Sequence, residues 1–375
     1  MVPALDRLKT AIPGQKSISF SPEIESLRGV ASLAVVMGHL YLFLFMPILG
    51  FNINSSHESI LNLLVAGIFD PQPAVLLFFT ISGLVLGRQL RKEPIVDFFS
   101  FLAYLCRRAF RLIPLMWTTT ILAFFLWNSM NRLDPSVLRA TLLLNDIGIN
   151  VPLWSLKVEL YCSLIFPIIF LLFEFGGKLI NLLLFALFTT LSFYWHEPIY
   201  IQFLVFFHAG LLVDRIAKAT YFIPQGIATL LLGLAITVLL LAPEFSIGNR
   251  NWMHGYWQSW VLPEIVACPF ILLFIASQPS SNFNAFLRLT PIRYLGKISF
   301  SIYLIHFPVF LYMKNYYPLT GTLLNSLGFL ISYLTVVITL SSLTFRWIEI
   351  PSNELGKRLS SYILKASRRT ALLTE

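Results

Sequence analysis

Long apolar segments dominate this sequence, and short polar connections separate them. Each is long enough, or nearly long enough, to cross the hydrocarbon core of a bilayer as a helix. The chain is 57% hydrophobic and only 12% charged, about half the charged fraction of a soluble domain. So much apolar surface does not fit inside one water-soluble core. The ten segments cover residues 28–47, 72–88, 111–128, 152–173, 178–195, 199–214, 222–242, 257–277, 295–313 and 323–347.

The pattern predicts an all-α polytopic integral membrane protein with about ten transmembrane helices and both termini in the cytoplasm. We expect one membrane domain over residues 1–375. Within it, residues 1–27 would form a cytoplasmic N-terminal segment, 28–347 the bundle, and 348–375 a cytoplasmic tail. The first apolar segment lacks a small-residue cleavage pattern, so it is expected to be a retained span and not a signal peptide.

The distribution of positive charge supports this topology. With both termini inside, 22 of the 27 Lys and Arg residues fall on the cytoplasmic side and 4 fall outside, as the positive-inside rule predicts. The net charge of +9 is then a property of the topology, and no nucleic-acid partner is expected. The cysteines Cys106, Cys162 and Cys268 have neither metal-ligand nor disulfide spacing, so no metal is expected.

Arg28 and His39 lie in the first apolar segment, eleven residues apart. Eleven residues are close to three helical turns, so the two side chains share a helix face about 16 Å apart. Arg28 would lie at the cytoplasmic edge and His39 near the middle of the membrane. Alone, Arg28 reads as a headgroup anchor and His39 as a helix-packing residue. Their common face favours a functional interpretation.

A basic cluster precedes the third segment at Arg107, Arg108 and Arg111. Arg111 shares a helix face with both of the others, by i, i+4 and i, i+3 spacing. Ordinary positive-inside flanking explains one or two of these arginines. Clustered guanidinium groups also suit phosphate, and with Arg28 they predict a binding site for a phosphorylated cytosolic donor.

The fourth segment carries Glu159 about 10 Å below its start, at a depth similar to that of His39. A carboxylate at this depth is either functional or the partner of a buried basic residue. In the ninth segment, Ser299, Tyr303 and His306 share one face and place a second histidine near mid-membrane. A polar stripe that joins helices is the alternative.

Ser82 lies in FFTISG of the second segment, where its neighbour Gly83 suggests close helix contact. Glu349, in WIEIP at the end of the tenth segment, is expected to form a salt bridge with a nearby basic residue.

These segments, in this order, resemble the acyltransferase 3 family of membrane acetyl- and acyltransferases. The matching elements cover nearly the whole chain: Arg28 with His39, FFTISG at 78–83, the basic segment at 107–111, WSLxxE from Trp154 to Glu159, GKISFSIYLIH at 296–306, which includes Ser301, and WIEIP at 347–351. The resemblance implies transfer of acetyl or another acyl group to hydroxyls of polysaccharides, peptidoglycan, lipid-linked sugars or small secreted molecules. Some relatives carry a fused esterase-like domain, which we do not expect here.

We therefore expect a plasma-membrane O-acyltransferase that uses acyl-CoA, most simply acetyl-CoA, and an extracytoplasmic acceptor such as a glycan. The arginines would bind the donor phosphates and His39 would act as general base. Glu159 would orient His39 or stabilise its imidazolium. His306, Ser299 or Tyr303 would donate hydrogen bonds to the oxyanion.

Three alternatives remain at this stage. A covalent acyl-histidine route fits the same residues as general-base catalysis. A transporter or flippase would use the intramembrane charges as a polar path, although no repeat symmetry is visible. A structural scaffold would not need three ionisable groups at mid-depth.

Overall fold

The computed structural model describes residues 21–45, 65, 67–130, 133–194, 200–217, 223–241, 261–318 and 322–374. Within these ranges the chain is helical and has no strand, which confirms the all-α class. The elements are α2 (Pro22–Leu40), η1 (Tyr41–Phe45), α5 (Gln72–Lys92), α6 (Phe98–Met130), α7 (Pro135–Leu142), α8 (Leu153–Phe175), α9 (Gly177–Tyr194), η2 (Ile201–Phe203), α10 (Leu204–Ala217), α11 (Gln225–Leu241), α12 (Val261–Ser277), α13 (Asn282–Leu287), α14 (Thr290–Lys297), α15 (Ser299–Tyr316), α16 (Leu323–Thr344), η4 (Phe345–Glu349) and α17 (Ile350–Thr374).

Each of the ten predicted segments coincides with a helix, but the helices differ in their ability to span a membrane. Six helices of the described chain are long and apolar enough to cross a bilayer, and a seventh qualifies if the bent pair α14–α15 counts as one span. The apolar helices α11 and α12 are shorter, and α10 has only 14 residues. Length and composition thus support six to seven candidate spans among the described residues, and they do not confirm the predicted ten.

Two helices begin well before the predicted apolar segments. Helix α2 starts at Pro22, six residues before Arg28, so Arg28 lies inside the helix and not at its edge. Helix α6 runs for 33 residues, about 50 Å, and contains the whole basic cluster that we expected to precede a span. Hydropathy missed both beginnings because the first turns of α2 carry Glu23 and Glu25 and because Arg107, Arg108 and Arg111 interrupt the apolar run of α6.

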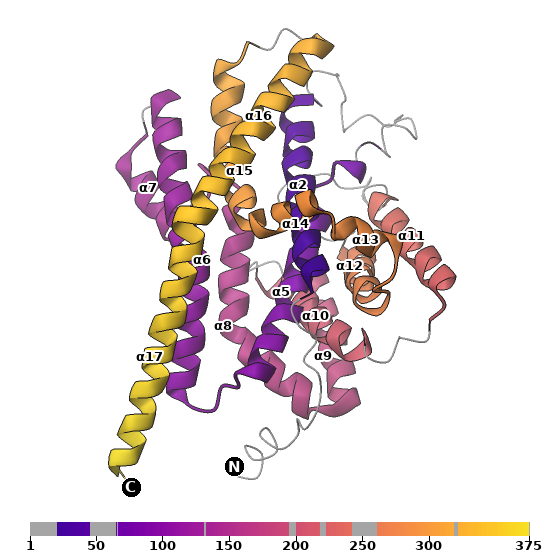
Figure 1. Cartoon of the computed structure of the whole chain (residues 1–375), viewed down its shortest axis with the longest axis vertical. Coiled ribbons are helices and arrows are strands. Elements are labelled where there is room, and N and C mark those ends of the chain that lie inside the picture. Colours follow the sequence, from indigo (N-terminus) through magenta and orange to yellow (C-terminus); the bar gives the residue numbers. More distant parts are fainter. Residues whose placement is uncertain are drawn as a thin grey trace.

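The ninth predicted segment is not a single straight helix. Helices α14 and α15 meet at Ile298 with a bend of 73°. His306 therefore lies seven residues into α15, about 10 Å from its start, and not 16 Å from the start of a straight span at 295. In Figure 1, α14 crosses α2 while α15 stands beside α16.

Helix α16 continues through the π-helical turn η4 into α17, and together they form one long rod (Figure 1). Helix α17 lies along the first half of α6. The residues that we expected to form a tail are thus a helix packed against the bundle. We call the end of the bundle that holds the C-termini of α5 and α8 and the N-terminus of α6 the lower end, as it is drawn in Figure 1.

Paired glycines bring two pairs of helices into backbone contact. A Cβ atom on Gly29 of α2 would lie 2.4 Å from the backbone of Gly296 in α14, and one on Gly296 would lie 2.5 Å from Glu25 O. Gly83 of α5 and Gly210 of α10 are related in the same way, through Phe207 O at 2.1 Å and Thr80 O at 2.2 Å. Small residues at such crossings are typical of membrane helices, and the close contact expected at FFTISG is confirmed.

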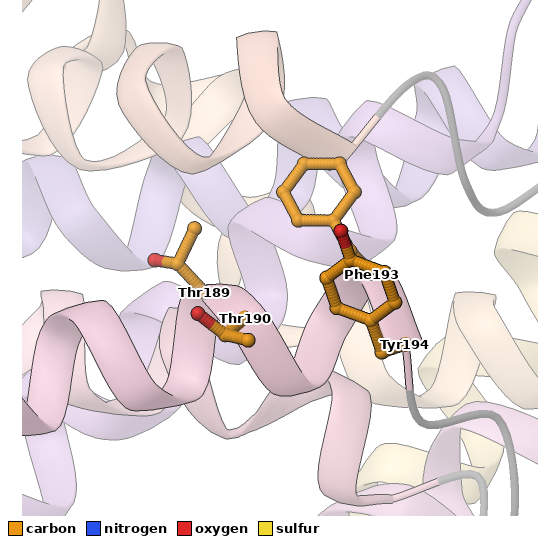
Figure 2. A pocket seen from close by; sticks show the side chains of 4 residues that line it. All are labelled: Thr189, Thr190, Phe193 and Tyr194. Carbon is orange, nitrogen blue, oxygen red and sulfur yellow. The ribbon is translucent and has the colours of Figure 1, made fainter.

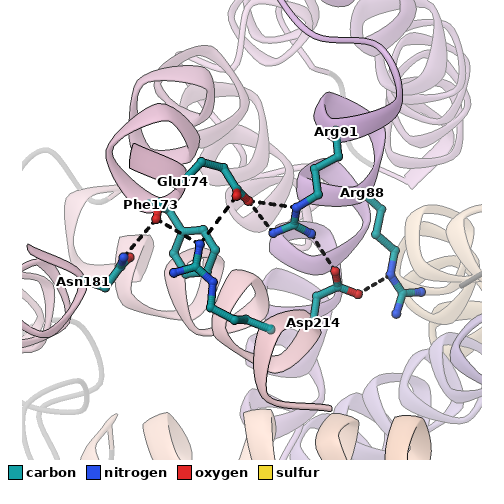
Figure 3. A network of polar contacts seen from close by, with 7 residues as sticks. Arg88, Arg91, Phe173, Glu174, Asn181 and Asp214 are labelled. Carbon is teal, nitrogen blue, oxygen red and sulfur yellow. Dashed lines mark hydrogen bonds and ion pairs between the residues drawn. The ribbon is translucent and has the colours of Figure 1, made fainter. Parts of the chain in front are cut away.

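A group of ion pairs joins α5, α8 and α10 at the lower end (Figure 3). Asp214 accepts from Arg88 Nε at 2.7 Å and from Arg91 Nη1 at 2.6 Å. Arg91 also pairs with Glu174 at 2.6 Å, and Arg215 pairs with Glu174 at 3.5 Å. We call these five residues the arginine–carboxylate network. Because each guanidinium contacts a carboxylate, the network fixes the helices that carry the candidate site.

Candidate active site

His39 of α2 and His306 of α15 form a direct pair. His39 Nδ1 and His306 Nε2 lie 3.1 Å apart, and the ring centroids lie 5.1 Å apart. His306 is completely buried, whereas His39 is partly exposed. The rings of Phe43 and Phe307 pack against His39 at 5.9 and 5.4 Å. Two histidines predicted only to share a depth are therefore in contact.

The surrounding acceptors assign the ring protons of a neutral pair. His306 Nδ1 lies 2.7 Å from Tyr303 O and 3.2 Å from Ile302 O. Carbonyl oxygens only accept, so Nδ1 carries the proton of His306 and its Nε2 carries a lone pair. His39 Nδ1 faces that lone pair and also Val35 O at 3.0 Å, so it too is a donor. The remaining lone pair of the dyad is on His39 Nε2.

The other polar residues of α15 have protein partners of their own. The hydroxyl of Tyr303 lies 2.6 Å from Ser155 Oγ and donates to Pro152 O at 3.3 Å, both on or next to α8. Ser301 donates to Glu349 at 3.1 Å. The salt bridge expected for Glu349 is not among the ion pairs of the described residues. Ser299 lies buried in the first turn of α15.

Two of the three residues of α15 that we expected to contact an oxyanion, His306 and Tyr303, have their donor groups on protein acceptors. These donors are the one ring N–H of His306 and the hydroxyl of Tyr303. Trp154 packs against the aromatic rings of Phe79 and Phe203 and contributes to the apolar core beside the site. In this geometry His306 Nε2 accepts a hydrogen bond from His39 Nδ1.

Glu159 lies one turn beyond Ser155 on α8, about 6 Å along the axis, and it contacts Arg108 and Ser82. Arg108 Nη2 donates to Glu159 Oε1 at 2.8 Å, and Ser82 Oγ donates to the same oxygen at 3.2 Å. Ser163, a further turn along α8, accepts from Arg108 Nη2 at 2.8 Å. Three predicted site residues, Glu159, Arg108 and Ser82, are thus brought together, and no hydrogen bond or ion pair of the described residues joins them to the histidine pair.

A cavity of about 310 Å³ opens at the lower end, and basic side chains line it. We call it the basic pocket. It holds the whole predicted cluster of α6 together with residues from α5 and α17: Gln89, Arg107, Arg108, Arg111, Asn353 and Lys357. Four of the six lining residues carry positive charge, which is a composition suited to phosphate.

The arginines of the basic pocket differ in how far their charge is neutralised. Arg107 pairs with Glu93 at 2.9 Å and bonds Ser360, and Arg108 pairs with Glu159. Arg111 is half-buried and has no ion pair or hydrogen bond within the described residues. Arg28 of α2 is close enough to Arg111 and Glu159 to interact with both electrostatically. The carboxyl group of Glu349 also interacts electrostatically with Arg111 and Arg28. Three arginines and two carboxyl groups therefore lie between the pocket and α2, and positive charge is in excess.

The sequence profile of a known family matches most of this chain. The profile described as "Acyltransferase domain" covers residues 21–346. The chain belongs to the acyltransferase 3 family. The matched range contains all twelve site residues that we predicted from the sequence, and it ends before α17 begins.

Individual relatives of this acyltransferase 3 family member are distant. The O-acetyltransferase OatA of Staphylococcus aureus strain MRSA252 is 23% identical over 146 residues, which cover 38% of this chain and 22% of the relative. OatA of strain NCTC 8325 / PS 47 is 24% identical over 140 residues, 36% of this chain and 21% of the relative. The match thus spans about a fifth of the length of these relatives. No solved structure matches significantly.

Several residues around the site were not predicted from the sequence. Ser163 follows Glu159 by four residues, and Ser155 precedes it by four, so same-face spacing around Glu159 identifies both in retrospect. The pocket residues Asn353 and Lys357 share the i, i+4 spacing. They belong to an amphipathic stretch that a search for apolar segments passes over.

The sequence analysis also did not predict a group of buried polar residues at the upper end of the bundle, which is the end opposite the lower end. Gln72 Nε2 donates to Glu264 at 3.3 Å, and the Gln72 backbone N–H donates to Asp70 at 2.9 Å. Burial raises the pKa of Asp70 to about 7, and the hydrogen bond from Gln72 opposes this. The loop before α5 packs on α2 at Gly38, where an added Cβ would lie 2.6 Å from Phe69 O. This group therefore supports the helix turn that carries His39.

A second hollow lies at the end of α9 and is lined by Thr189, Thr190, Phe193 and Tyr194 (Figure 2). None of these side chains is charged at neutral pH. The groups suited to acyl transfer therefore lie at the histidine pair and the basic pocket.

Proposed function

We propose that this protein transfers an acyl group from a cytosolic acyl-CoA thioester to a hydroxyl group on the other side of the plasma membrane. The observation that carries the proposal is the histidine pair, whose one ring nitrogen with an available lone pair is Nε2 of the partly exposed His39. Family membership supports the reaction class, and the similarity to the O-acetyltransferase OatA favours acetyl as the transferred group.

In the proposed reaction His39 Nε2 removes the proton of the acceptor hydroxyl. The oxygen attacks the thioester carbonyl, a C–O bond forms, and the C–S bond breaks. The departing CoA sulfur takes the proton from His39, which returns the pair to its starting state. An imidazole that is neutral before the reaction suits both proton transfers. His306 is a positioning residue, because its Nε2 holds the Nδ1 proton of His39 in place.

The donor would bind from the lower end, which we assign to the cytoplasm. Arg107, Arg108 and Arg111 line the basic pocket. The guanidinium group of Arg111, which has no ion pair or hydrogen bond within the described residues, would bind a phosphate oxygen. Arg28 would add charge on the side of α2. Glu159 holds Arg108 by its 2.8 Å ion pair, so it would set the position of one phosphate ligand. A role for Glu159 on His39 itself stays a prediction.

The finer topology belongs to the same proposal. We place both termini in the cytoplasm and count ten spans, with the short helices α10, α11 and α12 crossing the membrane between longer neighbours. Support comes from the excess of Lys and Arg on the side that this topology puts inside. The acceptor would be a glycan or another hydroxyl-bearing molecule outside the cell. No contact among the described residues favours the transporter alternative.

The direct test is replacement of His39 by Ala in cells that depend on this protein for surface acylation. Alkali-released acetate from the cell envelope should fall at least about 100-fold, as loss of a general base predicts, while the amount of membrane-inserted protein stays unchanged. Undiminished acetate from that variant overturns the assignment. Radiolabelled acetyl-CoA without acceptor separates the routes, since an acyl-histidine would leave label on the protein.

The positioning role of His306 needs a conservative variant. His306→Leu removes the acceptor for the Nδ1 proton of His39, whereas His306→Gln keeps an oxygen that can accept it. We expect acetate release to fall at least about tenfold with Leu and to recover partly with Gln. Equal loss in both variants, at equal protein levels, would mean that His306 has a packing role only.

A further inference from the structure

Helix α17 lies beyond the residues that the family profile matches, yet it forms one wall of the basic pocket. The profile ends at residue 346 and α17 begins at Ile350. Gly356 brings α17 close to α6, because an added Cβ would lie 2.6 Å from Phe110 Cβ. The hydroxyl of Ser360 accepts from Arg107 Nη1. These contacts fix the rotation of α17 against α6.

The same rotation directs a polar stripe of α17 at the pocket. Asn353 and Lys357 are separated by one helical turn and both line the cavity. Gly356 and Ser360, which make the contacts with α6, lie on the adjoining face. The pocket-lining part of α17 is thus set by its packing, and Lys357 is the one basic residue that it contributes to the cavity lining.

The cations of the pocket form a gradient from solvent to interior. The side chain of Lys357 is 67% exposed, that of Arg107 19%, and that of Arg108 7%. Lys357 is paired with Glu354 at 3.0 Å, one turn back on α17. Exposed pairs of this kind contribute little stability, so the ammonium group can exchange Glu354 for a ligand at small cost.

We propose that Lys357 binds the outermost phosphate of the acyl-CoA donor, the 3′-phosphate of its ribose. This rests on the proposed function. The thioester must reach His39, so the nucleotide end of CoA stays at the mouth of the pocket, where Lys357 is exposed. The diphosphate lies deeper, near Arg108 and Arg111. A phosphomonoester carries close to two negative charges at neutral pH, which suits the compact ammonium of Lys357.

The test compares CoA with dephospho-CoA, which lacks only the 3′-phosphate, in calorimetric titrations of the purified full-length protein. Lys357→Ala should weaken CoA binding roughly fivefold, the size of one solvent-exposed charged hydrogen bond. Its affinity for dephospho-CoA should equal that of the wild type. Arg358→Ala is the matched control, because Arg358 is exposed on the same helix, carries the same charge and is not part of the cavity lining. It should leave both affinities unchanged.

A substitution that is expected to strengthen CoA binding makes the test more specific. Glu354→Gln removes the competing carboxylate from Lys357, so CoA should bind about twofold more tightly and dephospho-CoA should not. The inference is overturned if Lys357→Ala behaves like Arg358→Ala toward CoA. It is also overturned if Lys357→Ala leaves CoA binding unchanged and only weakens the binding of phosphatidylglycerol to the detergent-solubilised protein, since the lysine would then serve lipid phosphate. Failure of the wild type to bind CoA at all would instead contradict the proposed function.

Discussion

Two arginine clusters lie at the lower end of the bundle, and they differ in how their charge is balanced. In the arginine–carboxylate network, Asp214 and Glu174 contact all three guanidinium groups of Arg88, Arg91 and Arg215. In the basic pocket, Arg111 has no partner within the described residues, and Lys357 has only an exposed one. Gln89 of the pocket directly follows Arg88 of the network, so the two clusters lie on different faces of α5.

The difference separates a structural cluster from a binding cluster. A buried charge needs a partner, and where carboxylates of the chain supply it, the cluster joins helices. Where the described residues leave a cation without a carboxylate at ion-pair distance, as for Arg111, we expect the partner to come from outside. Sequence composition does not make this distinction, because both clusters contain arginines at the ends of apolar helices.

The largest expected effect is on the network. Asp214→Ala leaves Arg88 and Arg91 without their shared carboxylate in a buried position, and this should cost about 3 kcal/mol of stability. Thermal unfolding of the detergent-solubilised protein measures it. Glu354→Gln removes an exposed carboxylate and should change stability by less than about 0.5 kcal/mol. Equal melting temperatures for the two variants would contradict the structural role of Asp214.

The second effect is on the basic pocket. Arg111→Gln removes an unpaired cation, so CoA binding should weaken at least about tenfold, the loss of one charged hydrogen bond. The melting temperature should stay the same or rise, because no ion pair is broken. A fall in stability comparable to that of Asp214→Ala would show that Arg111 has a partner in the folded protein and would remove the distinction between the clusters.

The smallest effect comes from salt. Ionic strength screens exposed charges more than buried ones, so raising NaCl from about 0.05 to 0.5 M should weaken CoA binding several-fold and leave the melting temperature nearly unchanged. Calorimetry and thermal unfolding on the same samples make the comparison. Binding that is independent of salt would indicate that the donor is recognised by its apolar arm and not by the basic pocket.

The helices of this fold were predictable from the sequence because lipid selects long apolar segments. The helix ends were not. The first turns of α2 after Pro22 and the whole of α17 contain many polar residues, so their mean hydropathy is lower than that of the apolar segments. The bend at Ile298 was not predictable because the segment GKISFS contains no proline. The bend occurs where α14 packs on α2 through Gly296.

The candidate site shows a similar limit. Helical rise gave His39, Glu159 and His306 their approximate depths, but depth does not determine which side chains meet. The contacts of His39 with His306 and of Glu159 with Arg108 depend on helix rotation and order. Helix rotation and helix order are set by packing between segments far apart in the chain. This packing cannot be derived from a single sequence.

The crossing of Gly29 and Gly296 acts as a pivot for the histidine pair. His39 lies ten residues beyond Gly29 and His306 ten residues beyond Gly296. In α2 those residues make an arm of roughly 15 Å, so a tilt of about 4° at the glycine shifts His39 by about 1 Å. A methyl group at Gly29 would force such a tilt, and the two imidazoles would separate although neither had been touched.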